Sequence, residues 1–228
     1  LKLKLLIYLL LQVEKCNLED STCMTAAFNK AVPIFMAGIP ELGVEVEDVM
    51  EMEDFSFDIS GLQFTFKDGK IKGLKNSVFE DIKWDLKKKH LEIFFHMDST
   101  IKGHYIAGGR ILILPITGDG QMKLKLKHVQ LKFRIDYDIE KDDEGKEHVA
   151  PKKYSYEFDV KENANFNLTN LFNGNKELSD TMLTFLNENW KQISTEFGKP
   201  MIDVAAKKLF KNMVQFFKHQ PIADIANY

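Results

Sequence analysis

Apolar and polar residues alternate along the middle of this chain, from about residue 55 to residue 168. A repeat of two residues is typical of strands that bury one face and expose the other. Candidate turns at residues 87–90 and at Gly118–Gly120 divide the stretch into hairpins. The charged run at residues 140–147 is interpreted as an exposed hairpin loop. The pattern therefore predicts a large antiparallel sheet with one apolar face.

The alternation changes phase at two places, at Ser60-Gly61 and near Lys127-His128. A shift of one residue would turn a regular strand inside out, so we expect a bulge or bend at each place. The longest expected strand, over residues 122–139, would span about 59 Å. Few globular domains contain a strand of this length.

Helical repeats flank the sheet region on both sides. Residues 22–38 are expected to form a short helix that ends at Gly38. Residues 177–218 are expected to form one helix about 61 Å long, kinked at Pro200 because proline lacks an amide N–H. The apolar stripe of this helix rotates at the proline, so the sheet must curve to cover both halves. The expected fold class is α+β, with a long C-terminal helix wrapped by a highly curved antiparallel sheet.

The composition excludes several classes of protein. Of the 228 residues, 44% are hydrophobic and 29% are charged, which is typical of one soluble globular unit. Lys and Arg total 31 against 34 Asp and Glu, a net charge of -3, so no overall basic field attracts nucleic acid. No apolar stretch reaches the roughly 20 residues that span a bilayer as a helix. We expect a monomer with no nucleic-acid partner and no stable membrane insertion.

A short apolar run at residues 5–11 follows two lysines near the start of the chain. It is typical of the apolar part of a signal peptide, and we interpret residues 1–12 as a remnant of one, followed by a single domain over residues 13–228. An exposed amphipathic strand is the alternative. If the segment is a signal, the compartment is oxidising and Cys16 and Cys23 form a disulfide.

Motifs for catalysis and metal binding are absent from the sequence. The six histidines form no His-x-x-x-His pair and join no cysteine cluster, so we expect them to be solvated on strand faces and expect no metal site. No nucleophile elbow or dinucleotide fingerprint occurs, so we expect no enzyme and no cofactor. In a secreted chain, Asn167 of Asn-Leu-Thr is a possible glycan acceptor, although such triplets are common by chance.

Phenylalanine is unusually common, with 18 Phe against 6 Tyr and 2 Trp. The alternation places many of these rings on the inward face of the sheet, where they either pack solid or enclose an apolar tube. Tyr105, Tyr137, Tyr154 and Tyr156 are candidates to offer hydroxyls to a bound lipid. The candidate ligand-binding residues that would line a cavity are Phe64, Phe66, Trp84, Phe95, Tyr105, Ile111, Phe133, Tyr137, Phe158, Met182, Phe185, Trp190 and Phe197.

Several ordered motifs resemble those of one known family. They are the loop from Cys16 to Cys23, Gly38-Ile-Pro-Glu-Leu-Gly43, Gly73-Leu74, Gly103-His-Tyr-Ile-Ala-Gly108, Ile111-Leu-Ile-Leu-Pro-Ile-Thr-Gly-Asp-Gly120, Leu171-Phe-Asn-Gly-Asn-Lys-Glu-Leu178 and Phe185-Leu-Asn-Glu-Asn-Trp190. From Cys16 to about Ile225 the chain resembles the insect takeout and juvenile-hormone-binding protein family. The resemblance implies a tubular lipid-binding fold, an elongated internal cavity and transport of hydrophobic ligands such as juvenile hormone or fatty-acid-like molecules.

Two departures from the family pattern refine this resemblance. The hormone-binding branch usually has a second disulfide to the long helix, and this chain has no further cysteines to form it. That absence points to the takeout branch. The segment at residues 44–50 stands where the family often has a proline-rich stretch, so the mouth of the cavity is expected to differ there in shape or charge.

The leading hypothesis is a secreted, extracellular, non-catalytic carrier. It would bind a juvenile-hormone-like terpenoid or a fatty-acid-like lipid in an internal apolar tunnel, driven by apolar burial at roughly 25 cal/mol per Å². The alternative is an interaction protein that uses the fold as a scaffold or contacts membranes and bacterial lipids. A lipid-ester hydrolase is a third hypothesis, but no nucleophile and base pair is visible in the sequence.

Overall fold

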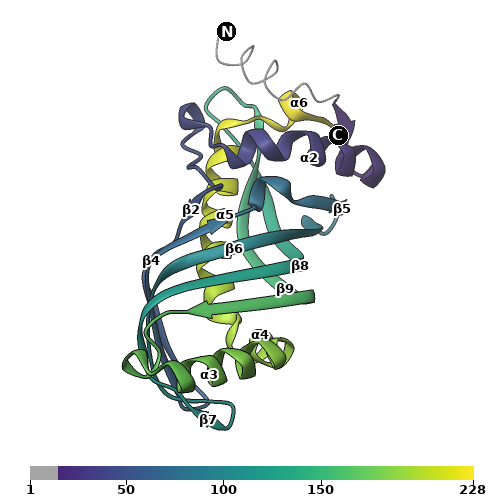
Figure 1. Ribbon diagram of the computed structural model, residues 1–228. Coiled ribbons are helices and arrows are strands. Elements are labelled where there is room, and N and C mark those ends of the chain that lie inside the picture. The colour runs from purple at the N-terminus through teal and green to yellow at the C-terminus, as the bar shows by residue number, and fades with distance from the viewer. Residues whose placement is uncertain (1–14) are drawn as a thin grey trace.

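The computed structural model describes residues 15–228 and contains a long, curved antiparallel sheet (Figure 1). β6 (His90–Ile111), β8 (Gly118–Lys141) and β9 (Glu147–Leu168) have 22, 24 and 22 residues. The strand order is β2-β4-β6-β8-β9, with β3 pairing with β4 and both β5 and β7 pairing with β6. The signal remnant expected at residues 1–12 lies outside the described residues. The shorter strands are β1 (Cys16–Asn17), β2 (Met50–Glu51), β3 (Phe55–Ile59), β4 (Leu62–Lys72), β5 (Val78–Asp85), β7 (Leu114–Pro115) and β10 (Ala226–Asn227).

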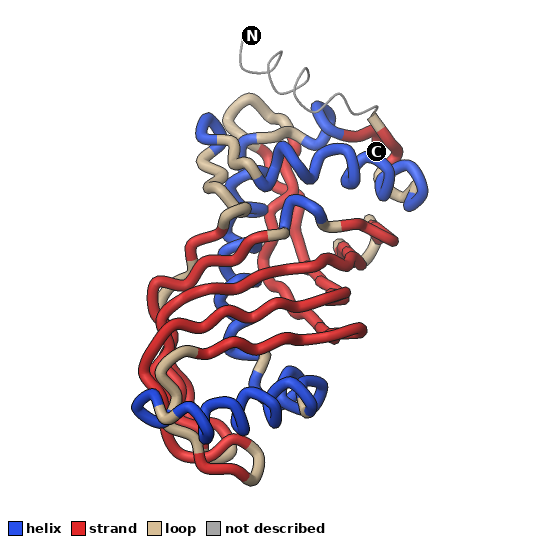
Figure 2. Tube along the Cα trace, viewed as in Figure 1, coloured by secondary structure: helices blue, strands red, loops and turns tan. Residues whose placement is uncertain are grey.

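The sheet curves around one helix, α5 (Lys199–His219), which lies along its inner face (Figure 2). α2 (Ser21–Met36) covers one end of the sheet. α3 (Lys176–Glu188) and α4 (Trp190–Phe197) lie at the other end. The short α6 (Ile222–Ile225) follows α5 on the side of α2. This arrangement confirms the expected α+β class with a curved sheet around C-terminal helices.

α2 covers the outer edge of β5 through polar side chains. The Asn29 side chain accepts a hydrogen bond from the Phe79 amide at 2.9 Å and donates one to the Phe79 carbonyl at 2.9 Å. The Thr25 hydroxyl accepts from the Ile82 amide at 3.0 Å. These bonds replace a neighbouring strand, so this part of the edge is not open to another chain. The helix expected at residues 22–38 is confirmed and ends two residues earlier.

The two phase changes have different causes. Ser60 and Gly61 have φ of 51° and 85° and form a two-residue hairpin turn between β3 and β4. The phase change at Ser60-Gly61 therefore marks the turn between two strands and is not a bulge. Across a two-residue turn an odd-numbered residue pairs with an even-numbered one, so the apolar positions change from odd to even numbers. Near Lys127-His128 the expected bulge is confirmed, because these two residues of β8 lie opposite Asp98 alone of β6.

The turn expected at Gly118–Gly120 is wrong, because these residues begin β8. The chain reverses earlier, between β6 and β7, where Leu112 has a φ of 53°. The two glycines permit close packing instead. A Cβ at Gly118 would lie 2.4 Å from the Tyr105 hydroxyl oxygen, and one at Gly120 would lie 2.4 Å from the Thr169 carbonyl oxygen.

The single helix expected over residues 177–218 is also wrong, because α3, α4 and α5 share this stretch. The first break is at Asn189, whose side-chain amide donates to the Phe185 carbonyl at 2.8 Å. The second break is at Gly198, and Pro200 then lies in the first turn of α5, where its missing N–H loses no helical hydrogen bond. α5 has 21 residues and is about 32 Å long, so the sheet encloses a helix about half the expected length.

Cys16 and Cys23 form a disulfide that joins β1 to the start of α2. β1 in turn pairs in parallel with β10, with Cys16 opposite Ala226. Replacing both cysteines by serine should lower the free energy of unfolding by about 2 kcal/mol, because the unfolded chain gains loop entropy. Differential scanning calorimetry should show Tm lower by about 4–8 °C. Reduction of the parent protein should reproduce this fall, and an unchanged Tm in both samples would contradict the prediction.

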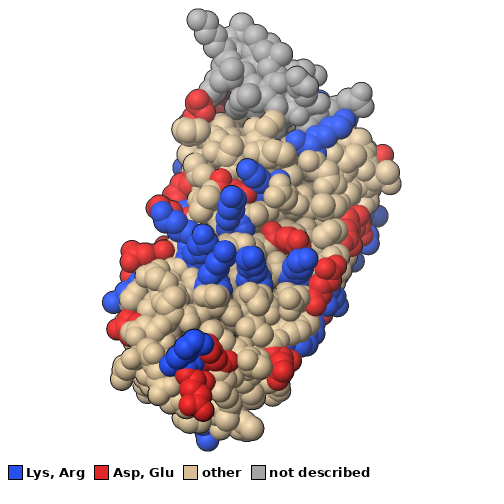
Figure 3. Space-filling view, in the orientation of Figure 1, with Lys and Arg blue, Asp and Glu red and all other residues tan. Residues whose placement is uncertain are grey.

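Lysines gather on the outer face of the sheet, and Figure 3 shows basic side chains across the middle of the visible face. Lys70, Lys102 and Lys123 lie directly opposite one another on β4, β6 and β8. Because like charges in register repel, Lys102→Glu should raise Tm in dilute buffer, and about 1 M NaCl should remove the gain. Thermal melts at the two salt concentrations check this, with Lys102→Gln giving a smaller gain. A lower Tm for Lys102→Glu in dilute buffer would count against it.

Candidate functional site

One cavity, termed the large cavity, has a volume of about 540 Å³ and lies between α2, the curved sheet and α5. This volume is typical of pockets that bind small hydrophobic molecules. Cys16 of the disulfide and residues of β10 and α6 form part of its wall. The other lining side chains are mainly apolar and include Met24, Ala27, Phe28, Ala31, Val32 and Phe35 of α2, Trp84, Leu91, Ile93, Phe95 and Phe133 of the sheet, and Leu209, Met213, Phe216 and Phe217 of α5.

A second cavity of about 90 Å³ lies farther along the apolar interior, between the sheet, α4 and the start of α5. A row of aromatic rings links the walls of the two cavities. Phe133 lines the large cavity and stacks with Tyr156 at a centroid distance of 6.3 Å. Tyr156 lies 6.4 Å from Phe158, which lines the small cavity. The interior is therefore packed in part and hollow in part.

The candidate lining residues fall into three groups. Three of them, Trp84, Phe95 and Phe133, line the large cavity. Four others line the small cavity, namely Phe64, Ile111, Phe158 and Phe197. The remaining six are packed in the core or against it and line neither cavity of the described chain: Phe66, Tyr105, Tyr137, Met182, Phe185 and Trp190.

Sequence reasoning missed the contribution of two helices to the large cavity. Met24, Phe28, Val32 and Phe35 recur at helical spacing in α2, and this stripe predicted the helix without indicating that the stripe faces a cavity. Leu209, Met213 and Phe216 form the matching stripe on α5. The sequence pattern of both helices contained a signal for these cavity walls, because each helix is apolar along the side that faces the sheet.

Two buried hydrogen-bond donors at or near the large cavity lack partners. Trp84 lines the cavity, and its Nε1 is buried with no hydrogen-bond acceptor among the described residues. The same is true of the Tyr137 hydroxyl, whose ring contacts the Trp84 ring at a centroid distance of 5.3 Å. Burial raises the pKa of Tyr137 to about 12, so its phenol stays protonated at neutral pH. Buried polar groups are normally paired, and of these two residues only Trp84 lines the cavity, which makes Trp84 Nε1 the candidate for contact with a bound molecule.

Two of the other candidate tyrosine hydroxyls are bound within the fold. Tyr105 donates to the Thr169 carbonyl at 2.7 Å. Tyr156 donates to the Asp203 carboxylate, and burial together with this contact raises its pKa. These two hydroxyls therefore stabilise contacts between elements and are not directed at an open space.

One histidine departs from the expected solvated placement. His148 is buried, with Nδ1 3.0 Å from the Phe217 carbonyl oxygen and Nε2 3.2 Å from Asp142 Oδ2. It ties the loop between β8 and β9 to the end of α5. Its ring nitrogens therefore contact a backbone carbonyl and a carboxylate, which is a structural arrangement.

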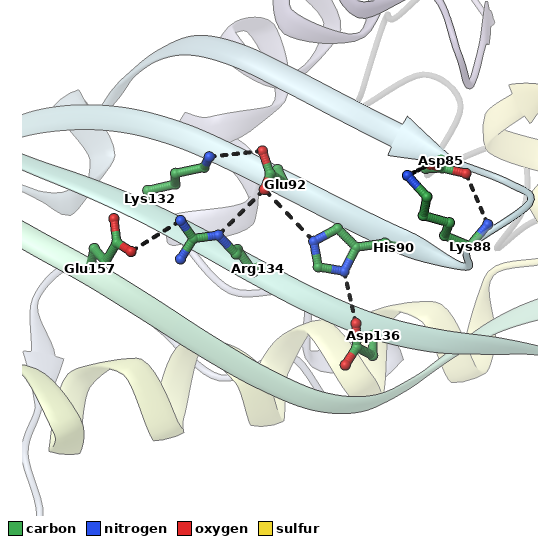
Figure 4. Close-up of polar contacts among 8 residues, drawn as sticks. All are labelled: Asp85, Lys88, His90, Glu92, Lys132, Arg134, Asp136 and Glu157. Carbon is green, nitrogen blue, oxygen red and sulfur yellow. Dashed lines mark hydrogen bonds and ion pairs between the residues drawn. The ribbon is translucent and has the colours of Figure 1, made fainter.

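Charged side chains on the outer face of the sheet pair with one another (Figure 4). Glu92 Oε2 lies 3.0 Å from Lys132 Nζ, and its Oε1 lies 3.3 Å from Arg134 Nε. These two cations hold the pKa of Glu92 below its usual value, and the Lys132 ammonium has the larger effect. Arg134 also lies 3.1 Å from Glu157. The network crosses β6, β8 and β9 and binds neighbouring strands together.

The segment that connects α2 to β2 is bound to α5 near the large cavity. Asn212 of α5 accepts from the Glu45 amide at 3.1 Å and donates to the Glu45 carbonyl at 3.0 Å. Lys211 forms an ion pair with the Glu45 carboxylate at 2.8 Å. The Glu47 carboxyl is fully buried and accepts from the Asn212 amide, while burial raises its pKa to about 7. The acidic segment, expected to alter the cavity mouth, thus docks on polar groups of α5.

The exposed surface contributes two further observations. Asn167, the possible glycan acceptor, is exposed on β9, opposite Lys123 of β8. Within residues 15–228, no helix combines the length and apolar character required to cross a membrane.

Comparisons with known proteins agree with this geometry. The family model described as haemolymph juvenile hormone binding protein (JHBP) matches residues 8–227. The crystal structure of Takeout 1 from Epiphyas postvittana superposes with a TM-score of 0.93 at 66% identity, over 95% of this chain and 100% of that chain. The circadian clock-controlled protein daywake is 27% identical in Drosophila yakuba and 28% identical in Drosophila melanogaster. Each match covers 215 residues, 89% of this chain and 82% of the relative.

The comparisons and the fold point to the same family. The matched region includes all of the described residues except Tyr228. Proteins of this family bind lipophilic ligands. The chain therefore belongs to the insect takeout and juvenile-hormone-binding protein family of lipophilic-ligand carriers.

Proposed function

We propose that this protein is a carrier that holds one terpenoid or fatty-acyl molecule in the large cavity between α2 and α5. The observation that carries the proposal is a cavity of about 540 Å³ with mainly apolar walls in a chain of this family. Transfer of apolar ligand surface out of water contributes roughly 25 cal/mol per Å². A sugar or nucleotide would lose its hydrogen bonds to water on entering, so the walls favour a hydrocarbon chain.

The unpaired donor of Trp84 supports a ligand that carries a polar acceptor at one end. Trp84 lines the large cavity, and its Nε1 can donate a hydrogen bond that no other described residue accepts. An ester, a carboxyl group or another carbonyl group would satisfy such a donor. We therefore propose a ligand with an apolar chain and one carbonyl-containing end, which describes both juvenile-hormone-like terpenoids and fatty acids.

We also propose that the protein acts as a secreted monomer. A disulfide such as Cys16–Cys23 persists in oxidising compartments and is rare in the reducing cytosol. The family description names haemolymph proteins, which supports the same location. An extracellular carrier would keep a sparingly soluble lipid out of water during transport.

Native mass spectrometry of protein purified from insect cells tests the proposal, together with displacement of a fluorescent fatty acid. We expect a bound hydrophobic molecule, and displacement that tightens about fourfold per added CH₂ until the cavity is full. Recovery of protein without ligand, combined with no displacement by terpenoids or fatty acids, would overturn the carrier proposal. That result would favour a scaffold role in protein interaction or in contact with membranes and bacterial lipids.

The matched variant Trp84→Phe tests the polar end of the ligand separately. It removes the Nε1 donor and keeps an aromatic ring in the wall. We expect weaker binding of a fatty-acid methyl ester and little change for the hydrocarbon of equal length, because only the ester accepts a hydrogen bond. Equal losses for both compounds would show that Trp84 contributes only apolar contact.

A further inference from the structure

The pairing of adjacent strands is irregular at three neighbouring places in the sheet. The register shifts between Phe79 and Asp81 in the pairing of β5 with β6, and between Met97 and Ser99 in the pairing of β6 with β8. It shifts again after Lys127 in the pairing of β8 with β9. Bulges re-aim the side chains of the extra residues and are frequent beside functional sites.

These bulges bring side chains from three strands together on the outer face. Glu80 is the extra residue of β5, and His128, with a φ of 51°, is one of two β8 residues that lie opposite Asp98 of β6. His96 of β6 lies between them, because it is paired with both Val78 and Gln130. The Asp98 carboxylate accepts a hydrogen bond from the His128 amide at 2.8 Å and fixes the bulge.

The three side chains present their donor atoms within a small volume. One ligand atom from each of Glu80, His96 and His128 lies within 4.8 Å of the others. His96 Nδ1 is 2.5 Å from Glu80 Oε1, and the two imidazole rings stack with centroids 4.4 Å apart. Glu162 of β9 adds a carboxylate whose Oε1 is 3.6 Å from His128 Nδ1.

We propose that Glu80, His96 and His128 form a binding site for a divalent transition metal, with Zn²⁺ as the best match and with Glu162 placed to supply a fourth ligand. Imidazole nitrogen and carboxylate oxygen are the donors that Zn²⁺ takes in this combination. Zinc bonds of about 2.0–2.1 Å place tetrahedral ligand atoms about 3.4 Å apart. The partly exposed side chains can close that distance by rotation while the strands stay in register.

A metal ion bound at this site would stabilise the sheet and would not contact the lipid cavity. Its ligands lie on the outer face, whereas the cavity lies on the inner face, and none of the four residues lines it. A bound ion would join β5, β6, β8 and β9 where each strand is irregular. Since the unfolded chain lacks the assembled site, binding should stabilise the folded state by mass action.

Equilibrium dialysis and isothermal titration with ZnCl₂ test the site in the full chain, freed of metal and without an affinity tag. We expect one Zn²⁺ per chain and a Tm that rises with Zn²⁺ concentration. His96→Gln and His128→Asn should each weaken binding at least about tenfold and reduce the Tm rise. Asparagine is chosen at 128 because it tolerates the positive φ.

His104→Gln is the matched control, since His104 lies on the same outer face and contacts Asp119 at 2.7 Å outside the cluster. It should bind Zn²⁺ as the parent does. Co²⁺ in place of Zn²⁺ should give the visible absorption of a tetrahedral site in the parent and in His104→Gln only. Absence of stoichiometric binding in the parent, or unchanged binding in the double variant of His96 and His128, would overturn the proposal.

Discussion

Replacement of Ala27 or Ala31 by tryptophan should lower the affinity for a fatty-acyl or terpenoid ligand by roughly thirtyfold. The two alanines lie one helical turn apart on α2 and line the large cavity. An indole at either position fills space that the ligand would occupy, and the loss of two or three buried CH₂ groups corresponds to about 2 kcal/mol. Displacement of a fluorescent fatty acid measures the change, and circular dichroism checks that the variant is folded.

Two matched variants make this experiment specific. Ala26 is exposed on α2, so Ala26→Trp should leave the affinity unchanged. Ile202 lines the small cavity, so Ile202→Phe tests whether the ligand reaches the second half of the interior. We expect no effect of Ile202→Phe on ligands of about 15 carbons. A loss equal to that of Ala31→Trp would place the ligand in both cavities, and unchanged affinity in Ala27→Trp and Ala31→Trp would exclude the large cavity as the binding site.

The sheet could be predicted because its signal is local. Alternation assigns each residue to a face without knowledge of its partner, and the bulge near His128 disturbs the alternation itself. The break at Asn189 could not be predicted in this way, since helix-forming residues continue through it. The helix before it is held to β9 by the Asn187 side chain, which accepts from the Phe166 amide at 2.7 Å and donates to its carbonyl at 3.0 Å. Such hydrogen bonds join residues that are far apart in the chain, so a local sequence pattern does not indicate them.

The residues that line the cavities could be predicted only in part. The alternation indicates which side chains point inward, but it does not indicate whether the space in front of them is empty or filled by other side chains. Phe64 and Phe66 share the inner face of β4, yet only Phe64 lines a cavity. The ring of Phe66 fills the space over two glycines, where a Cβ would approach it to 2.7 Å at Gly69 and 2.5 Å at Gly103. The cluster of His96 and His128 was hidden for a related reason, since three bulges on separate strands create it.

The buried carboxyl of Glu47 should make the protein less stable as pH rises from about 4.5 to about 7. Glu47 is fully buried, one of its oxygens accepts from Asn212, and the other has no partner among the described residues. Burial raises its pKa from the ordinary 4.5 to about 7 in the folded protein. Between these values the folded state holds a proton that the unfolded state has lost, so the free energy of unfolding falls with pH, by up to about 3 kcal/mol from this group.

Glu47→Gln removes the titration and keeps the shape of the side chain. Its free energy of unfolding should match that of the parent near pH 4.5 and exceed it by about 2–3 kcal/mol at pH 8, because only the parent must then bury a charge or take up a proton to fold. Urea unfolding of both proteins across this pH range measures the difference and cancels the titration of groups that they share. Glu53→Gln is the control, since Glu53 is exposed and the Lys207 ammonium lowers its pKa, so its pH profile should not show this gain. Parallel profiles for Glu47→Gln and the parent would mean that Glu47 is ionised in the folded state without cost, and that water or a cation reaches its second oxygen.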